Sequence, residues 1–202
     1  YGCTPDGGRF LVMELVDGLP LDEYFRAHPE DIWTILYELC ETLVFVHARN
    51  LLHQDIKPSN ILVARTASAG GERPLVKLID FGLTYQRGGN TAVRLVGTAE
   101  YIAPEVVRGS ATLTRAVDYY SLGATLFELL CGAPPFAGTE SEVLRAHLER
   151  EPVFEQEELE WAELYPHVRA LLSKDAQARL VAFEEFRRAV VGRLTGGIED
   201  LD

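Results

Sequence analysis

The hydrophobic positions along the chain are spaced mostly as they are in α-helices. In residues 31–48, apolar side chains recur every three or four positions and share one broad face: Ile32, Ile35, Leu36, Leu39, Leu43 and Val46. The same kind of pattern predicts four more helices, at about residues 117–130, 141–150, 161–172 and 183–194. The pattern therefore favours a protein that is rich in helix.

Runs that resemble β-strands are short and lie in the first half of the chain. Turn-forming residues at 4–8 precede the apolar run 10–13, which predicts a β-hairpin whose second strand ends at about residue 16. Two further strands are predicted at 61–63 and 75–79, with a surface loop rich in Ala, Gly, Ser and Thr between them. Residues 82–99 show no clear period, and such a stretch in a compact domain is usually functional or mobile.

Composition narrows the classes of function. The 202 residues are 47% hydrophobic and 25% charged, which suits one large globular domain. Acidic residues outnumber basic ones by 31 to 19, and the formal net charge is −12. We expect no nucleic-acid partner, because such partners need a clustered positive surface. We also expect no membrane segment, since no apolar run approaches the roughly 20 residues of a membrane span.

The cysteines indicate the redox compartment of the chain, and its first residues indicate whether it is part of a longer polypeptide. Cys3, Cys40 and Cys131 lie far apart without CxxC spacing, which predicts neither a disulfide framework nor a zinc site. They favour a reduced, cytoplasmic setting. The chain begins with Tyr1 and has a single methionine, Met13, so we expect it to be a piece of a longer polypeptide.

One short segment concentrates chemically active side chains. His53-Gln54-Asp55-Ile56-Lys57-Pro58-Ser59-Asn60 holds a carboxylate, an ammonium group and a carboxamide within eight residues. Asp80-Phe81-Gly82 follows 25 positions after Asp55, and Ala103-Pro104-Glu105 follows 23 positions after Asp80. A lone Asp-Phe-Gly is more often a turn. Together and in this order, the three motifs resemble the catalytic loop, DFG and APE signatures of the eukaryotic-type (Hanks-type) serine/threonine protein kinase family.

The resemblance covers almost the whole chain and implies an α+β, mostly α, protein-kinase-like fold. Residues 1–194 would form a protein kinase domain fragment: 1–16 the last hairpin of the N-terminal (small) lobe with the hinge, and 17–194 the C-terminal (large) lobe. Residues 195–202 would be an acidic tail or linker. We expect most of the small lobe to be missing.

The resemblance assigns roles in phosphoryl transfer to four residues. Asp55 would be the catalytic base that accepts or orients the proton of the attacking hydroxyl, and Lys57 would neutralise charge on the transferred phosphoryl group. Asn60 and Asp80 would hold Mg²⁺ through oxygen atoms, the ligands that a hard cation prefers. ATP and Mg²⁺ are therefore the cofactors that the resemblance implies.

Two features of the resemblance indicate serine and threonine hydroxyls of protein substrates. Lys57, two residues after Asp55, is typical of the serine/threonine class, whereas tyrosine kinases usually carry Asp-x-Ala-Ala-Arg-Asn. In the family, the threonine of the segment 97–105, here Thr98, contacts the catalytic Asp and Lys. Small-molecule kinases generally lack this segment, so a metabolite kinase is disfavoured.

Five more positions match structural supports of the family. Asp118 would open the central helix and hydrogen-bond the catalytic-loop backbone, although an Asp at a helix start is equally a plain N-cap. Arg179 would pair with Glu105 of the APE motif and so hold the activation segment to the large lobe. His53 and Phe81 match an aromatic stack that links the catalytic loop to the core, although each alone is more often just a core residue.

The nucleotide contacts implied by the resemblance are mostly backbone or packing contacts. Met13 falls at the gatekeeper position at the back of the adenine site. The Glu14 carbonyl and the backbone of Val16 would be the hinge groups that face adenine, and Leu21 and Leu62 would form an apolar floor.

The chain also departs from the family pattern. No glycine-rich loop, strand lysine or partner glutamate can be placed in it, since Gly7-Gly8 belongs to the predicted hairpin turn. We therefore expect weak or no kinase activity from the isolated chain, and an active enzyme in a parent protein that supplies the small lobe.

A second departure is Gln54, which stands where most members have an arginine that pairs with a phosphorylated activation-loop residue. A neutral glutamine cannot form that ion pair, and Arg94 lies near the usual phosphate position. We expect activity that does not depend on phosphorylation of this loop, although Thr91 remains a possible site.

A second hypothesis from another class remains open. The chain can be read as a pseudokinase or scaffold domain that binds protein partners and performs no transfer. Pseudokinases usually lose the catalytic Asp, the metal-binding Asp or both, whereas Asp55 and Asp80 are both present here. The enzyme is therefore the preferred interpretation. The protein substrate and the upstream signal are not specified by the sequence.

Overall fold

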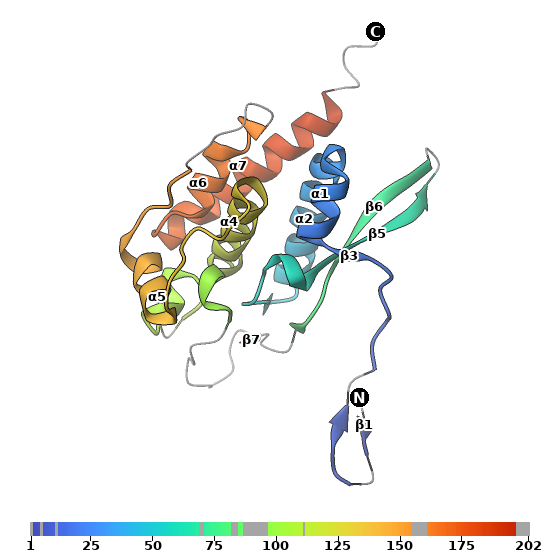
Figure 1. Cartoon of the computed structure of the whole chain (residues 1–202), viewed down its shortest axis with the longest axis horizontal. Helices are drawn as coiled ribbons and strands as arrows, with labels where there is room; N and C mark the ends of the chain where they lie inside the picture. Colours follow the sequence, from blue (N-terminus) through green and yellow to red (C-terminus); the bar gives the residue numbers. More distant parts are fainter. Residues whose placement is uncertain are drawn as a thin grey trace.

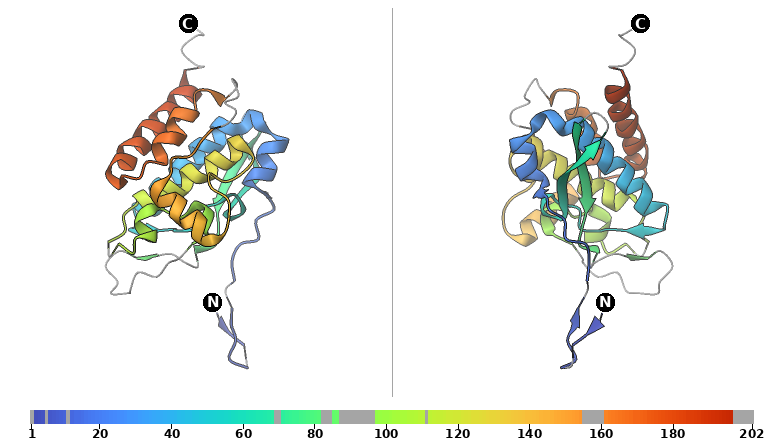
Figure 2. Two further views of the ribbon diagram at one scale, coloured as in Figure 1. Left: turned by 60° about the vertical axis from the view of Figure 1, so that its left-hand side comes forward. Right: turned by 90° about the vertical axis from the view of Figure 1, so that its right-hand side faces the viewer.

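The computed structural model describes residues 2–4, 6–10, 12–68, 71–81, 85–86, 97–110, 112–154 and 161–196. Most of these residues form a helical body with a small antiparallel sheet on one side (Figure 1). A hairpin at the N-terminus projects away from this body, and the last helix, which ends at Thr195, points toward the opposite end (Figure 2). The fold is α+β with a predominance of helix, as the sequence predicts.

The N-terminal hairpin is confirmed, but its strands are shorter than predicted. β1 (Gly2–Cys3) pairs antiparallel with β2 (Arg9–Phe10), and the turn is closed by a 2.7 Å hydrogen bond from Thr4 N to Gly8 O. The second strand ends at Phe10, and residues 12–18 follow as an extended segment without strand assignment. The described residues leave its apolar side chains uncovered, since Val12, Met13 and Leu15 are 74%, 64% and 93% exposed.

The three-stranded sheet corrects the predicted surface loop at 64–74. β3 (Leu19–Pro20), β5 (Ile61–Ser68) and β6 (Gly71–Leu78) form an antiparallel sheet in the order β3-β5-β6, and the β5–β6 register runs from Ile61↔Leu78 to Ser68↔Gly71. The far half of this hairpin is largely exposed, so its residues lack the apolar alternation of a buried strand.

Polar contacts support that far half instead. Arg65 pairs with Glu72 across the strands at 3.2 Å, and Arg73 reaches Glu38 at 2.6 Å. Pro74 lies in β6, an edge strand, where the missing backbone N–H of proline is tolerated. The loop composition of the sequence therefore conceals two regular strands.

Two helices follow β3. α1 (Leu21–Ala27) was not predicted, although its buried residues Leu21, Tyr24 and Phe25 have helical spacing. A short 3-10 turn, η1 (Pro29–Asp31), leads into α2 (Ile32–His47). The structure confirms the helix predicted at 31–48 and buries the apolar face that defined it.

The second half of the body is helical. α3 (Pro104–Val107), α4 (Ala116–Cys131), α5 (Glu140–Glu149), α6 (Tyr165–Leu171) and α7 (Ala176–Thr195) succeed one another. The helices predicted at 117–130 and 141–150 are confirmed, and the helix predicted at 161–172 is the shorter α6. α7 begins at Ala176 rather than at about 183, because the Asp175 side chain accepts a 2.8 Å hydrogen bond from Gln177 N and caps the helix.

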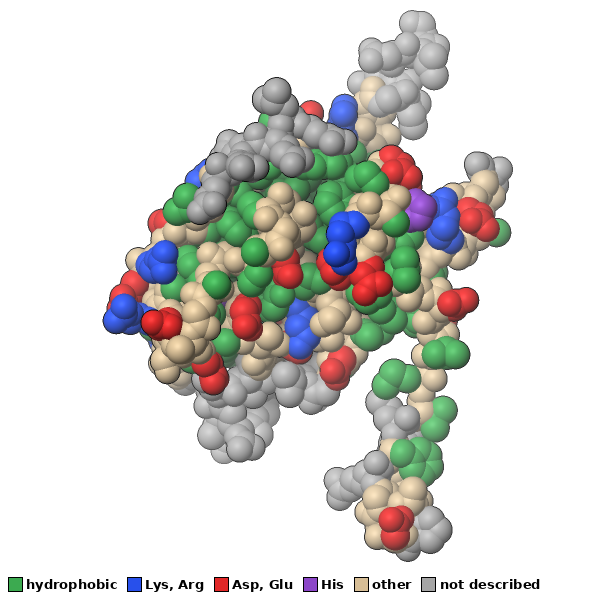
Figure 3. All heavy atoms as spheres, in the orientation of Figure 1, with side chains coloured by type: hydrophobic (Ala, Val, Ile, Leu, Met, Phe, Trp, Pro, Cys, Tyr) green, Lys and Arg blue, Asp and Glu red, His purple; other side chains and the backbone are tan. Residues whose placement is uncertain are grey.

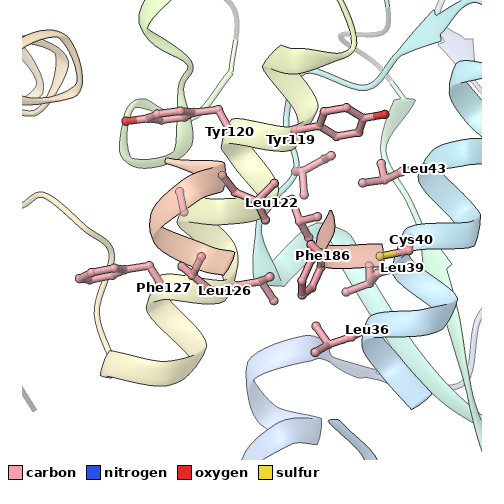
Figure 4. Packing of buried hydrophobic residues seen from close by; sticks show 14 of the residues in the cluster. Leu36, Leu39, Cys40, Leu43, Tyr119, Tyr120, Leu122, Leu126, Phe127 and Phe186 are labelled. Atoms are coloured by element: carbon pink, nitrogen blue, oxygen red, sulfur yellow. The ribbon is translucent and has the colours of Figure 1, made fainter. Parts of the chain in front are cut away.

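The core lies between α2, α4, α6 and α7. Figure 4 shows side chains of α2 facing Leu122 of α4 and Phe186 of α7. Tyr119 stacks on Phe183 with ring centroids 3.9 Å apart. At Gly123 a Cβ would lie 2.9 Å from Cβ of Leu171, so the close approach of α4 to α6 needs glycine.

Several short elements lie next to the loops that carry the predicted catalytic residues. β4 (Leu51–Leu52) pairs with β7 (Tyr85–Gln86), while η2 (Pro58–Asn60) and η4 (Ala99–Tyr101) are single 3-10 turns. The face in Figure 3 carries acidic, basic and apolar side chains interspersed over the body, and further apolar ones along the extended N-terminal segment. Among the described residues, no helix has both the length and the apolar character to cross a bilayer.

Candidate active site

The loop between β4 and η2 brings Asp55 into a nearly closed polar cluster. Asp55 is 7% exposed. Its Oδ1 accepts hydrogen bonds from Thr98 N at 3.0 Å and Thr98 Oγ1 at 2.8 Å. Its Oδ2 faces Lys57 Nζ at 2.9 Å and accepts a 2.9 Å hydrogen bond from Asn60 Nδ2. Both carboxylate oxygens are therefore held in place by donors.

Thr98 and Lys57 also contact each other. Lys57 Nζ donates a 2.7 Å hydrogen bond to Thr98 Oγ1, so one hydroxyl lies between the ammonium group and the carboxylate of Asp55. The structure thus brings together the three side chains that the family resemblance expects to meet. The Lys57 side chain is 23% exposed, so its ammonium group can still be approached from solvent.

The donors around Asp55 set its protonation. Burial alone raises the pKa of the Asp55 carboxyl, but hydrogen bonds from Lys57 and Thr98, with the charge of Lys57, outweigh it. The pKa therefore lies below its ordinary value. Asp55 is an ionised carboxylate at neutral pH, the form that can accept a proton.

Asn60 and Asp80 come from backbone segments that lie side by side. Ile79 N donates a 2.9 Å hydrogen bond to the carbonyl oxygen of Asn60, the last residue of η2, and Asp80 is the residue that follows Ile79. Asn60 Nδ2 donates to Asp55 O at 2.8 Å as well as to its Oδ2, which turns the Asn60 amide oxygen away from Asp55. The Asn60 amide oxygen and the exposed Asp80 carboxylate are oxygen donors of the kind that Mg²⁺ prefers.

Asp80 has a left-handed backbone conformation, which is uncommon for residues other than glycine. Its φ is +62°, and Gln54 in the catalytic loop has φ +67°. Such left-handed residues cost free energy unless the surrounding structure holds them, and they gather at functional sites. Both residues adjoin the cluster around Asp55, which agrees with a site that the fold holds in a fixed shape.

Asp118, near the start of α4, holds the backbone of the catalytic loop through hydrogen bonds. Its carboxylate is fully buried and accepts hydrogen bonds from His53 N at 3.0 Å and Gln54 N at 2.8 Å. This contact is the one expected from the sequence. His47, whose Nε2 lies 2.7 Å from Asp118 Oδ2, was not singled out, because a histidine in the last turn of an amphipathic helix carries no signal of such a role.

His53 connects the loop to the end of β6. Its Nε2 lies 2.9 Å from Ile79 O, its Nδ1 accepts a 3.3 Å hydrogen bond from Asp55 N, and its ring meets Phe81 edge-on at 4.7 Å. The expected aromatic contact between His53 and Phe81 is therefore present. His53 is fully buried, whereas Phe81 is 40% exposed.

The segment 97–101 passes close behind the loop. Gly97 has φ +118°, and a Cβ there would lie 2.8 Å from Gln54 O. Only glycine combines this backbone with this approach. The approach places the next residue, Thr98, against Asp55.

Glu105 and Arg179 form the predicted ion pair. Arg179 is fully buried, and its Nη2 donates to Glu105 Oε1. The same guanidinium donates to Ala116 O at 2.9 Å and Ser173 O at 2.7 Å. Arg179 therefore joins the APE segment, the start of α4 and the loop before α7.

Comparison with known proteins agrees with this geometry. A sequence model described as the protein kinase domain matches residues 3–188. The serine/threonine-protein kinase PknB of Mycobacterium tuberculosis is 34% identical over 161 residues, which is 74% of this chain and 24% of PknB. CDPK-related kinase 4 of Arabidopsis thaliana is 35% identical over 184 residues, or 86% of this chain and 30% of that kinase. The chain belongs to the eukaryotic-type serine/threonine protein kinase family.

The matches cover only part of the length of the curated kinases. PknB of Mycobacterium leprae is 34% identical over 153 residues, which is 71% of this chain and 23% of that protein. The chain thus spans about a quarter of the length of the PknB kinases that it matches. The activity and substrates of the whole protein are therefore proposals.

The residues that the family resemblance places around adenine lie in different parts of this kinase domain: on the exposed N-terminal segment, in the sheet and in the core. Met13 and Glu14 lie on the exposed segment, where Glu14 Oε2 is 3.2 Å from Lys77 Nζ, and Val16 lies beyond them. Leu62 is half-buried and pairs with Pro20 in the sheet. Leu21 is fully buried in the core, so its side chain cannot form a floor exposed to a nucleotide. The nucleotide roles of the other four stay predictions.

Three positions singled out in the sequence lie outside the described residues. They are Gly82 of the DFG motif, Thr91 and Arg94. The expectations attached to them rest on the sequence alone.

Proposed function

We propose that this chain is the catalytic part of a protein kinase that transfers the γ-phosphoryl group of ATP to serine or threonine hydroxyls of protein substrates. The observation that carries the proposal is the contact of Asp55 with Lys57, Thr98 and Asn60, which keeps an ionised carboxylate beside an ammonium group. General-base chemistry requires a carboxylate in this form at neutral pH.

The proposed reaction uses these groups in turn. The substrate hydroxyl oxygen attacks the γ-phosphorus of ATP, the bond from that phosphorus to the bridging oxygen breaks, and ADP leaves with the electron pair. Asp55 accepts or orients the hydroxyl proton. Lys57 sits 2.9 Å from Asp55 Oδ2 and offsets negative charge on the transferred group. The Thr98 hydroxyl keeps both groups in one geometry.

Asn60 and Asp80 are proposed to hold Mg²⁺. When bound there, the ion would neutralise charge on the phosphates of ATP. The hydrogen bonds of Asn60 Nδ2 to Asp55 O and Oδ2 support this role, because they orient the amide and tie it to the proposed base.

The remaining parts of the nucleotide site are proposed to come from a small lobe in the parent protein. Met13, Glu14, Val16 and Leu62 would then form the adenine contacts. No segment of the sequence matches the family's glycine-rich loop or its phosphate-binding strand lysine. We therefore propose that this chain by itself has weak or no transferase activity.

A cytoplasmic location is part of the proposal. The three cysteines form no disulfide, and Cys3 and Cys131 are exposed. Exposed thiols suit a reducing compartment.

Transfer of label from [γ-³²P]ATP to a Ser/Thr peptide library tests the proposal, on this chain and on the longest natural polypeptide that contains it. Asp55→Asn should lower the rate about a hundredfold to ten-thousandfold in the active form. Glu185→Gln, which removes one exposed carboxylate on α7, should leave the rate unchanged.

Calorimetry of ATP binding with and without Mg²⁺ separates the enzyme from the scaffold. A kinase should bind ATP in a magnesium-dependent manner that Asp80→Ala abolishes. If the longest polypeptide neither binds ATP nor transfers phosphate, the proposal fails and the scaffold hypothesis takes its place.

A further inference from the structure

A pocket of about 450 Å³ lies behind the catalytic loop, at the end of α2, beside β4 and the start of α4. It is distinct from the cluster around Asp55, since none of its lining residues belongs to that cluster. Its volume falls in the range of small-molecule sites in proteins.

The walls of the pocket combine apolar and polar groups. Leu51 and Leu180, both half-buried, contribute apolar surface, and Asn50 and Thr114 contribute hydrogen-bonding side chains. Arg115 adds an exposed guanidinium, which forms no ion pair with any of the described residues. The pocket therefore offers a positive charge beside an apolar wall.

His47 is the buried polar side chain of the pocket. It is 5% exposed, and its Nε2 is held at 2.7 Å from Asp118 Oδ2. Its other nitrogen, Nδ1, is buried and has no hydrogen-bond partner among the described residues. Buried polar atoms are nearly always paired, and an exception calls for an explanation.

We propose that this pocket binds a small organic acid with an apolar body. The carboxylate would pair with Arg115, to which a two-pronged anion is well matched. The apolar body would lie against Leu51 and Leu180.

The pocket is connected to the catalytic loop. His47 contacts Asp118, and Asp118 accepts hydrogen bonds from the backbone amides of His53 and Gln54. A ligand that polarises or shifts His47 would therefore change the environment of these two amides. This connection gives a readout of binding that requires neither ATP nor kinase activity, so the inference does not rest on the proposed function.

The test uses 4-fluorobenzoate as the probe and the 202-residue chain as the protein. Fluorine NMR measures binding, and ¹H–¹⁵N spectra locate it. We expect saturable binding that shifts the amide signals of His53 and Gln54. Arg115→Gln should weaken binding about tenfold, the amount expected from loss of one charge-assisted contact.

Two controls isolate the charge. Arg108→Gln, at an exposed arginine outside the pocket, should bind the probe as the wild type does. The neutral isostere 4-fluorobenzamide should bind the wild type about tenfold more weakly than the acid. Absence of saturable binding overturns the proposal, as does equal binding of acid and amide or an affinity that Arg115→Gln leaves unchanged.

Discussion

The hydroxyl of Thr98 donates a 2.8 Å hydrogen bond to Oδ1 of Asp55, across 43 positions of sequence. The same hydroxyl accepts a 2.7 Å hydrogen bond from Lys57. A single side chain of the activation segment therefore touches both groups that are proposed to perform the transfer. The position of this segment and the protonation of Asp55 are consequently coupled.

Thr98→Ala should lower kcat about tenfold and move the acid side of the pH–rate profile to higher pH. The pKa of Asp55 is lowered in part by two hydrogen bonds from Thr98, so losing the one from the hydroxyl raises this pKa, and the carboxylate is lost at a higher pH on acidification. Thr98→Ser keeps the hydroxyl and should restore both kcat and the profile. A pH–rate profile that does not move in the alanine variant would show that other groups set the pKa of Asp55.

Arg179→Met should destabilise the protein by about 3–5 kcal/mol, because it leaves the carboxylate of Glu105 without its buried partner. Arg187 on the same helix provides the matched control. It pairs with Glu41 at 2.8 Å with both side chains more than a third exposed, so Arg187→Met should cost about 1 kcal/mol or less. Urea unfolding followed by circular dichroism measures both. Equal losses would contradict a special role of the Glu105–Arg179 pair.

Stability should decrease as the pH falls from about 6.5 toward 4, through His147. Burial, followed by the charge of Lys174, lowers the pKa of His147 from 6.5 to about 4, so the folded protein keeps this imidazole neutral where the unfolded chain takes up a proton. The unfolded state binds more protons in this window, and acid therefore favours unfolding.

Between pH 7 and pH 5, the loss of unfolding free energy from this source is about 2 kcal/mol. His147→Gln should remove most of this pH dependence. If the unfolding free energy of His147→Gln still falls as steeply when the pH is lowered, another group is responsible for the pH dependence.

Thr91→Ala should leave the rate of the active kinase near the wild-type value. Gln54 is neutral and cannot form the ion pair by which an arginine at this place holds a phosphorylated loop. Initial rates of peptide phosphorylation measure the effect. A loss of about a hundredfold or more would show that loop phosphorylation is required.

The proposed catalytic residues could be found from the sequence because they are close together in it. Asp55, Lys57 and Asn60 lie within six residues, so one loop conformation brings them together. Thr98 and Asp118 reach the same loop only through the tertiary fold, and the family resemblance supplied their placement. His47 had no such signal, and its contact with Asp118 is visible only once α2 and α4 are packed.

The elements that the sequence predicted wrongly have local physical causes. The far half of the β5–β6 hairpin is supported by pairs such as Arg65–Glu72, which leave no hydrophobic alternation to detect. α1 has only seven residues, too few for its period to stand out. Residues 10–13 were predicted as strand from composition, but pairing ends at Phe10, and no described neighbour covers Val12 or Met13.

The packing of α2 against α7 has a consequence for synthesis of the chain. The contact between Glu41 and Arg187 spans 146 positions, and Phe186, which covers the apolar face of α2, lies next to Arg187. At roughly 5–20 residues per second, a ribosome needs on the order of 7–30 seconds to make this interval. During that time the stripe of Ile35, Leu36, Leu39 and Leu43 lacks the part of its packing that α7 supplies. The nascent chain is thus expected to depend on a chaperone over this interval.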